Sequence, residues 1–160
     1  MLEIDFPLEI STFSDIPSNS GLGSSSAFAV GLLHALYGLK GQMQTKSTLA
    51  YEAARIEIDV LDRTMGLQDH FASAYGGLNV LRFDSGGLVS VEPVFYRRDC
   101  LERLVENLMM FWIGQERDAS AVLESQAATT PSKLDVLTEM CDFVPQMRSI
   151  VESGGDLDEI

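Results

Sequence analysis

A loop of glycines and serines that runs directly into an apolar segment is the feature that most constrains this chain. Residues 20–26 read SGLGSSS, and residues 27–39 are apolar on almost every face. Such a segment predicts a buried helix. Glycine permits a positive φ and a close approach of the backbone to a ligand. The first N–H groups of a helix lack internal partners and favour anions, so the loop predicts a phosphate-binding cradle, with a serine N-cap after a turn as the alternative.

The loop does not match the common nucleotide-binding motifs. A Walker A loop needs a lysine, and none lies between Met1 and Leu39. The Rossmann fingerprint has a different glycine spacing and a different flanking strand. The sequence Gly-x-Ser-x-Gly is absent, which disfavours a hydrolase of that type.

Two acidic residues are candidates for chemistry beside a phosphate. Glu57 falls in a predicted helix over 47–64, and Asp69 follows a break in the helical pattern. A carboxylate beside a phosphate can bind Mg²⁺ or accept a proton from an attacking hydroxyl. The alternative is that Asp69 caps a short helix and that Glu57 belongs to a solvated row with Asp59 and Asp62.

The histidines and cysteines give weaker signals. His34 lies in the apolar segment with no second ligand nearby, which predicts a histidine packed in the core. His70 follows Asp69 and either lines the same cleft or faces solvent. Cys100 and Cys141 have no metal-binding spacing and do not form a disulfide framework, which predicts two free thiols.

The order of the predicted elements indicates an α+β fold with helices against a sheet. Alternating apolar residues predict a strand at 2–13, and turn residues between two alternating runs predict a β-hairpin over 78–94. Residues 109–113 predict a short buried strand. Helical patterns occur at 27–39, 47–64, 68–75, 101–109, 118–127 and 132–152.

Charge and hydropathy restrict the partners. The 160 residues contain 24 acids against 11 lysines and arginines, a net charge of -13. This charge repels phosphate backbones and anionic lipids, so no nucleic acid or membrane partner is expected. The chain has neither an apolar run of about 18 residues nor a signal peptide, which favours a cytoplasmic location.

The loop resembles the phosphate-binding motif of the GHMP kinase superfamily, which includes galactokinase, homoserine kinase, mevalonate kinase and phosphomevalonate kinase. That motif is Pro-x-x-x-Gly-Leu-Gly-Ser-Ser-Ala, and residues 17–26 read PSNSGLGSSS, with one extra serine before Ala27. The runs IEIDVLDRTMGLQDHFASAYGGLNVLRF and FWIGQERDASAVLESQ resemble most closely the D-glycero-D-manno-heptose 7-phosphate kinase branch.

The resemblance implies a role for each matching position. Asp69 would be the catalytic base that faces the sugar hydroxyl, and Ser25 and Glu57 would bind Mg²⁺. The residues implied to bind the phosphates of ATP are Pro17, Ser20, Gly21, Leu22, Gly23, Ser24, Ser25 and Ser26. The branch usually has Gly-Lys-Gln-Asp-Gln around the base, whereas Leu67 and His70 replace the lysine and the second glutamine here.

The resemblance also implies a fold and a reaction. The fold would be GHMP kinase-like, with a first domain of the ribosomal protein S5 domain 2-like type and a left-handed crossover. Residues 1–95 would form part of the N-terminal ATP-binding domain, and residues 96–160 the start of the C-terminal domain. The reaction would transfer the γ-phosphoryl group of ATP to a sugar or sugar-phosphate hydroxyl, the anomeric one for a heptose 7-phosphate.

A non-catalytic or partner-dependent nucleotide-binding module is the alternative. Members of the family are longer, with an earlier strand motif and a later glycine-rich motif that this sequence lacks. We therefore expect little turnover from a truncated chain. Uncovered strand edges and helix faces would favour self-association.

Overall fold

The computed structural model describes residues 2–15, 20–111, 123, 126 and 129–155. The chain divides into two compact units, Met1–Gly76 with Glu116–Glu124 and Gly77–Gln115 with Ser125–Ile160. Each unit is described by itself. The helices and the hairpin confirm the predicted α+β class, and the division into domains at residue 95 stays a prediction.

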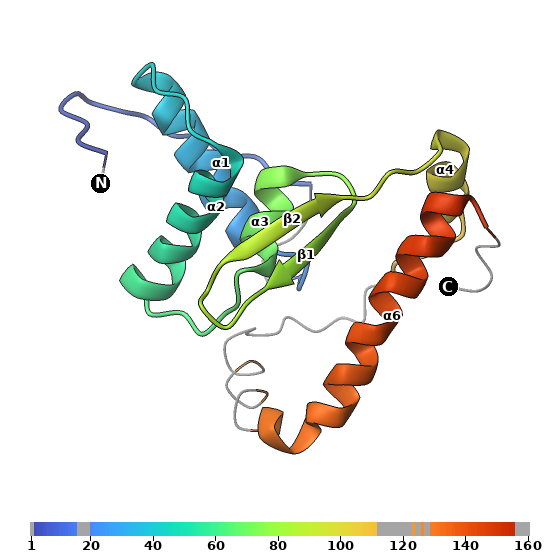
Figure 1. Ribbon diagram of the computed structural model, residues 1–160. Coiled ribbons are helices and arrows are strands. Elements are labelled where there is room, and N and C mark those ends of the chain that lie inside the picture. Colours follow the sequence, from blue (N-terminus) through green and yellow to red (C-terminus); the bar gives the residue numbers. More distant parts are fainter. Residues whose placement is uncertain (1, 16–19, 112–122, 124–125, 127–128, 156–160) are drawn as a thin grey trace. The chain divides into compact units, whose positions relative to one another are not determined.

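Three helices form the first unit (Figure 1): α1 (Ser24–Leu39), α2 (Lys46–Arg55) and α3 (Gln68–Tyr75). Each helix packs against the other two. Thr45 caps α2, because its hydroxyl accepts a hydrogen bond of 3.0 Å from Thr48 N. The small residues Ala50, Ala53 and Ala54 of α2 are buried and permit a close approach of the helices.

Two groups of side chains form the core of this unit. Val30, Leu49 and Ala53 make one cluster. Phe71 of α3 is fully buried and meets Tyr51 edge to face, with ring centroids 4.9 Å apart. Together these contacts hold the start of α1 and the start of α3 on one scaffold.

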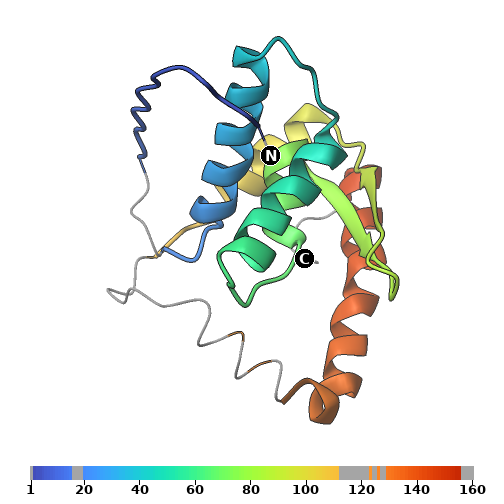
Figure 2. The ribbon, with the colours of Figure 1, turned by 90° about the vertical axis from the view of Figure 1, so that its left-hand side faces the viewer.

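The sequence predicted α1 correctly but overestimated its burial. Only Ser26 and Val30 are buried along this helix, and Phe28 is 51% exposed. His34 is exposed, so the prediction of a core histidine was wrong. The physical reason is that, among the described residues, α2 and α3 pack against one side of α1 (Figure 2), and Phe28 stays exposed.

The predicted strand at 2–13 is absent, since residues 2–15 contain neither strand nor helix. Phe6, Ile10 and Phe13 are exposed. Alternation predicts a strand only where a neighbouring strand pairs with it, and none does so among the described residues. The segment does contact α1 through Lys40, whose Nζ donates to the carbonyl of Glu3 at 2.6 Å.

In the second unit a β-hairpin confirms the predicted hairpin. Strands β1 (Asn79–Phe83) and β2 (Val89–Pro93) are antiparallel, with Val80 opposite Glu92. The carboxylate of Asp84 closes the turn by accepting hydrogen bonds of 2.8 Å from Gly86 N and Leu88 N. The turn chemistry therefore sets the register locally.

Helices α4 (Arg98–Glu106) and α6 (Leu134–Ser153) and the 3₁₀ turn η2 (Thr130–Lys133) belong to the same unit. They correspond to the helices predicted at 101–109 and 132–152. Val80, Val94 and Val151 form the core of this unit, so that α6 packs on the hairpin.

The prediction of a buried strand at 109–113 was wrong for the part of it that the structure describes. Residues 109–111 are irregular and exposed, and residues 112 and 113 lie outside the described residues. Most of the helix predicted at 118–127 also lies outside them. Cys100 is buried, Cys141 is exposed, and both are free thiols as predicted. Among the described residues no helix is long and apolar enough to cross a membrane.

Candidate functional site

The glycine loop has the backbone conformation that a phosphate cradle requires. Gly21 and Gly23 have φ values of 77° and 67° in the left-handed region. Gly23 occupies the N-cap position of α1, and no side chain caps the helix. The predicted open loop is therefore confirmed, and the alternative of a serine N-cap is wrong. The first amides of α1 remain available to an anion.

A hydroxyl beside the loop is buried without a partner. Ser20 Oγ makes no hydrogen bond within the described residues. A buried hydroxyl that lacks a partner costs about 1–3 kcal/mol. This group is therefore a polar atom that a bound ligand could satisfy.

Glu57 lies at a widened helical turn. The helix predicted over 47–64 ends as α2 at Arg55 and continues as the π-helical turn η1 (Ile56–Val60), closed by a bond of 2.9 Å from Leu61 N to Ile56 O. π-helical turns occur frequently at functional sites. Glu57 is only 2% exposed whereas Asp59 is exposed, so the alternative of a solvated acidic row is wrong for Glu57.

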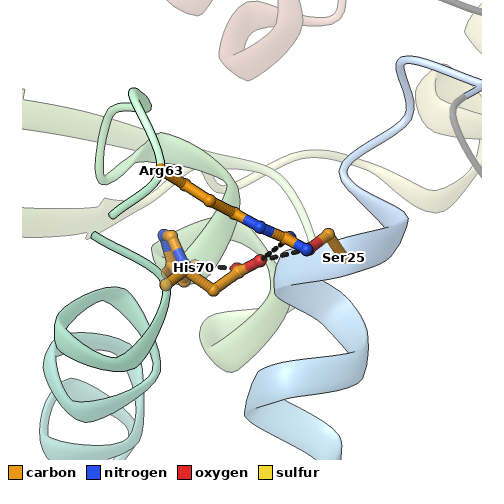
Figure 3. A network of polar contacts seen from close by, with 4 residues as sticks. Ser25, Arg63 and His70 are labelled. Carbon is orange, nitrogen blue, oxygen red and sulfur yellow. Dashed lines mark hydrogen bonds and ion pairs between the residues drawn. The ribbon is translucent and has the colours of Figure 1, made fainter. Parts of the chain in front are cut away.

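Side chains from three segments surround the Glu57 carboxylate (Figure 3). Ser25 Oγ of α1 donates a short hydrogen bond to Oε1. Arg63 Nη1 donates to the same oxygen at 2.8 Å and to Ser25 Oγ at 2.6 Å. His70 Nε2 of α3 lies 2.9 Å from Oε2.

Opposing effects set the pKa of Glu57. Burial raises the pKa of this carboxyl group, because water no longer solvates its charge. Hydrogen bonding to Ser25, Ser26 and His70 stabilises the ionised form and outweighs the burial, so the pKa lies below its ordinary value. Glu57 is therefore an anion at neutral pH.

His70 is buried rather than facing solvent. Its ring has no exposed surface, and Nδ1 makes no hydrogen bond within the described residues. The contact of Nε2 with Glu57 therefore holds the carboxylate from the side of α3. The sequence left both positions open for His70.

Asp69 lies against the glycine loop. A Cβ added at Gly23 would stand 3.1 Å from Asp69 Cγ and 3.2 Å from Oδ2. Asp69 is exposed, and no side chain caps α3, whose N-cap residue is Leu67. Asp69 thus lies beside Gly23 while Glu57 contacts Ser25, so both carboxylates lie at the start of α1, and their chemical roles stay predictions.

The oxygen atoms at this site suit a hard cation such as Mg²⁺ that binds together with a phosphate. Ser25 Oγ and Glu57 Oε1 are two adjacent oxygens of the kind that Mg²⁺ prefers. The described residues contain no group of three or more His, Cys, Asp or Glu side chains that could hold a metal ion by themselves. Mg²⁺ commonly binds through one or two carboxylates together with substrate phosphates.

Sequence reasoning missed Arg63, and one predicted residue cannot be placed. Arg63 lies in the irregular segment after η1, where its only sequence signal is a position six residues beyond Glu57. Pro17 lies outside the described residues. Leu22 is half exposed at the tip of the loop.

Comparison with known proteins identifies the family. Residues 1–77 match the family model described as the GHMP kinases N terminal domain. The chain belongs to the GHMP kinase superfamily. The matched range includes the glycine loop, Glu57 and Asp69, and the match therefore covers every residue that the structure brings together at this site.

Curated relatives in this superfamily are kinases by name. The chain is 31% identical over 123 residues to the D-glycero-alpha-D-manno-heptose 7-phosphate kinase of Campylobacter jejuni, over 74% of this chain and 35% of that protein. It is 42% identical over 72 residues to the mevalonate kinase of Methanothermobacter thermautotrophicus, over 45% of this chain and 23% of that protein. The chain thus spans about a third or less of these relatives.

A solved structure supports the GHMP kinase-like fold. The crystal structure of a protein described as a sugar kinase from Campylobacter jejuni superposes with a TM-score of 0.53. The superposition covers 84% of this chain and 42% of that one, at 24% sequence identity. At this identity the likeness concerns the fold alone.

Proposed function

We propose that this chain acts as an ATP-dependent small-molecule kinase that phosphorylates a hydroxyl of a sugar or sugar phosphate. A heptose 7-phosphate, with its anomeric hydroxyl as the acceptor, is the first candidate substrate, because one relative carries that name. The observation that carries the proposal is the convergence of Glu57 and Asp69 on the glycine loop at the start of α1.

The loop would bind the phosphates of ATP. The left-handed glycines Gly21 and Gly23 leave the backbone open, and the uncapped amides of α1 offer donors to phosphate oxygens. Ser20 would add a hydroxyl that lacks a partner within the described residues, and Ser26 would add a second hydroxyl. Ser24 and Leu22 would complete the loop around the phosphates.

Ser25 and Glu57 would hold Mg²⁺ beside these phosphates. When bound, this ion neutralises the negative charge that develops during phosphoryl transfer. The burial of Glu57 and its direct contact with Ser25 support the assignment, because they bring two oxygen ligands together at the start of α1.

Asp69 would accept the proton of the attacking hydroxyl. Its carboxylate is exposed at the start of α3, where an acceptor can reach it, and it lies beside Gly23, where the phosphates would bind. A general base must lie within hydrogen-bonding reach of the proton that it removes. Asp69 would then lie between the two reactants that the proposal requires.

Turnover and ATP binding with matched variants test the proposal. The full chain is incubated with ATP, Mg²⁺ and a panel of sugars and sugar phosphates, and ADP release is measured. Asp69→Asn should abolish turnover and retain ATP binding, whereas Asp59→Asn, the control at an exposed carboxylate of η1, should change neither. Absence of ATP binding by the wild-type chain would refute the proposal.

A nucleotide-binding module that needs a partner chain is the second candidate. It is favoured by the left-handed glycines and the uncapped start of α1, which offer a nucleotide-binding loop without depending on a catalytic base. ATP binding without turnover on any acceptor, unchanged in Asp69→Asn, would select this candidate over the kinase.

A further inference from the structure

Arg63 contacts both of the oxygens that the proposed function assigns to a cation. Its Nη1 donates to Ser25 Oγ at 2.6 Å and to Glu57 Oε1 at 2.8 Å, and these two oxygens are themselves hydrogen-bonded. Figure 3 shows the Arg63 side chain extended toward Ser25. One nitrogen therefore contacts both oxygens at once.

We propose that the Arg63 guanidinium acts as the cation bound to Ser25 Oγ and Glu57 Oε1, and that a divalent cation must displace it. This inference rests on the proposed function, since it takes the same two oxygens as ligands. Mg²⁺ lies about 2.0–2.1 Å from its ligand oxygens. A cation held by both oxygens would compete with Nη1 for their lone pairs, and a guanidinium keeps its charge and its protons in proteins. The two cations therefore exclude each other.

Arg63 is placed so that it can leave. Its side chain is 46% exposed, compared with 3% for that of Glu57. It follows η1 in a segment with no regular structure between Leu61 and Leu67. Its backbone N donates to Glu57 O at 3.0 Å, so the residue stays near the site after its guanidinium has moved.

Glu57 is held in place when Arg63 leaves. Its second oxygen, Oε2, is 2.9 Å from Nε2 of the fully buried His70. Ser25 Oγ and Arg63 contact only Oε1. Exchange of cations at Oε1 therefore leaves the contact at Oε2 intact.

Binding of Mn²⁺ without nucleotide tests the competition apart from catalysis. Mn²⁺ is a hard cation whose free concentration can be followed by electron paramagnetic resonance. In the full chain, Arg63→Gln should bind Mn²⁺ on the order of tenfold more tightly than wild type. The reason is that the variant lacks the charged hydrogen bonds from Arg63 to Ser25 and Glu57, which oppose Mn²⁺ binding. Glu57→Gln should weaken binding in both backgrounds.

Arg55→Gln is the matched control. Arg55 lies in the last turn of α2 and is exposed, so its removal changes the net charge equally. The control should leave the Mn²⁺ affinity within about twofold of wild type, since exposed charges act weakly on one another. If both arginine variants gained a similar factor in Mn²⁺ affinity, the change in net charge would explain the gain, and the proposal would be overturned.

Other outcomes also overturn it. Equal or weaker Mn²⁺ binding by Arg63→Gln would mean that Arg63 does not compete. No binding by Arg63→Gln at millimolar Mn²⁺ would mean that the oxygens are not a cation site. Failure of the proposed function is recognised separately, by the absence of ATP binding in wild type.

Discussion

Gly21 and Gly23 provide a matched test of the phosphate loop, because both have left-handed backbones and only one has a close neighbour. Their φ values are 77° and 67°. An added Cβ at Gly21 meets nothing within 4 Å, whereas at Gly23 it meets Asp69 Cγ at 3.1 Å. Alanine at each position therefore separates backbone strain from contact with Asp69.

The magnitudes follow from these distances. A left-handed backbone costs an L-residue about 1–2 kcal/mol, so both Gly21→Ala and Gly23→Ala should lower the free energy of unfolding by about that amount. Only in Gly23→Ala must the Asp69 carboxylate move by a few tenths of an ångström. Because misplacement by about 1 Å can cost a reaction 100-fold, we expect a further loss of turnover on the order of tenfold.

Urea denaturation, ATP titration and ADP release on the two variants give the measurements. Gly21→Ala should bind ATP more tightly than Gly23→Val, in which the larger side chain should abolish binding while the protein stays folded. The reasoning is refuted by equal turnover in the two alanine variants, or by a Gly23→Val variant with wild-type affinity for ATP.

Three further predictions concern stability. Phe71→Ala should lower the free energy of unfolding by about 3–5 kcal/mol, because the ring is fully buried against Tyr51; a loss below about 1 kcal/mol in urea denaturation would contradict this. Gly31→Ala in α1 should raise the free energy by about 0.5–1 kcal/mol, since an added Cβ meets nothing within 4 Å, and a lower thermal midpoint would count against it. Hydrogen bonding to Arg148, and then to Arg82, holds the pKa of Glu92 below its ordinary value. The ionised Glu92 carboxylate therefore contributes fully to the free energy of unfolding above the unfolded-state pKa, and this contribution disappears as pH falls through the lower folded-state pKa. The difference in stability between wild type and Glu92→Gln, measured by circular dichroism, should shrink on acidification. A difference that stays constant with pH would oppose this account.

The sequence predicted elements that short-range interactions determine. The hairpin was predictable because Asp84 and the following glycines close the turn by themselves. Helix α3 was predictable because it begins after Gly66 and ends before Gly76. The strand expected at 2–13 failed because a strand requires a partner, which local alternation cannot provide.

The sequence likewise predicted only part of the candidate site. The conformations of Gly21 and Gly23 follow from glycine spacing before an apolar helix, and the structure confirms them. The position of Arg63 depends on a contact with Ser25, 38 residues earlier in the chain, and on the turn after η1. Neither has a local signature. The burial of α1 was overestimated because composition cannot show how much of a helix its neighbours cover.

The environment of Glu57 argues for ligand binding rather than for stability alone. Removing a carboxylate from water is costly, and an apolar side chain of similar size commonly stabilises a fold at least as well. The contacts of the two oxygens are unequal. Oε2 meets His70, which is fully buried, whereas Oε1 meets Ser25, which is exposed, and Arg63, which is 46% exposed. One oxygen thus holds the side chain in place while the other faces partners that can be exchanged, as an oxygen that alternates between a guanidinium and a metal ion requires.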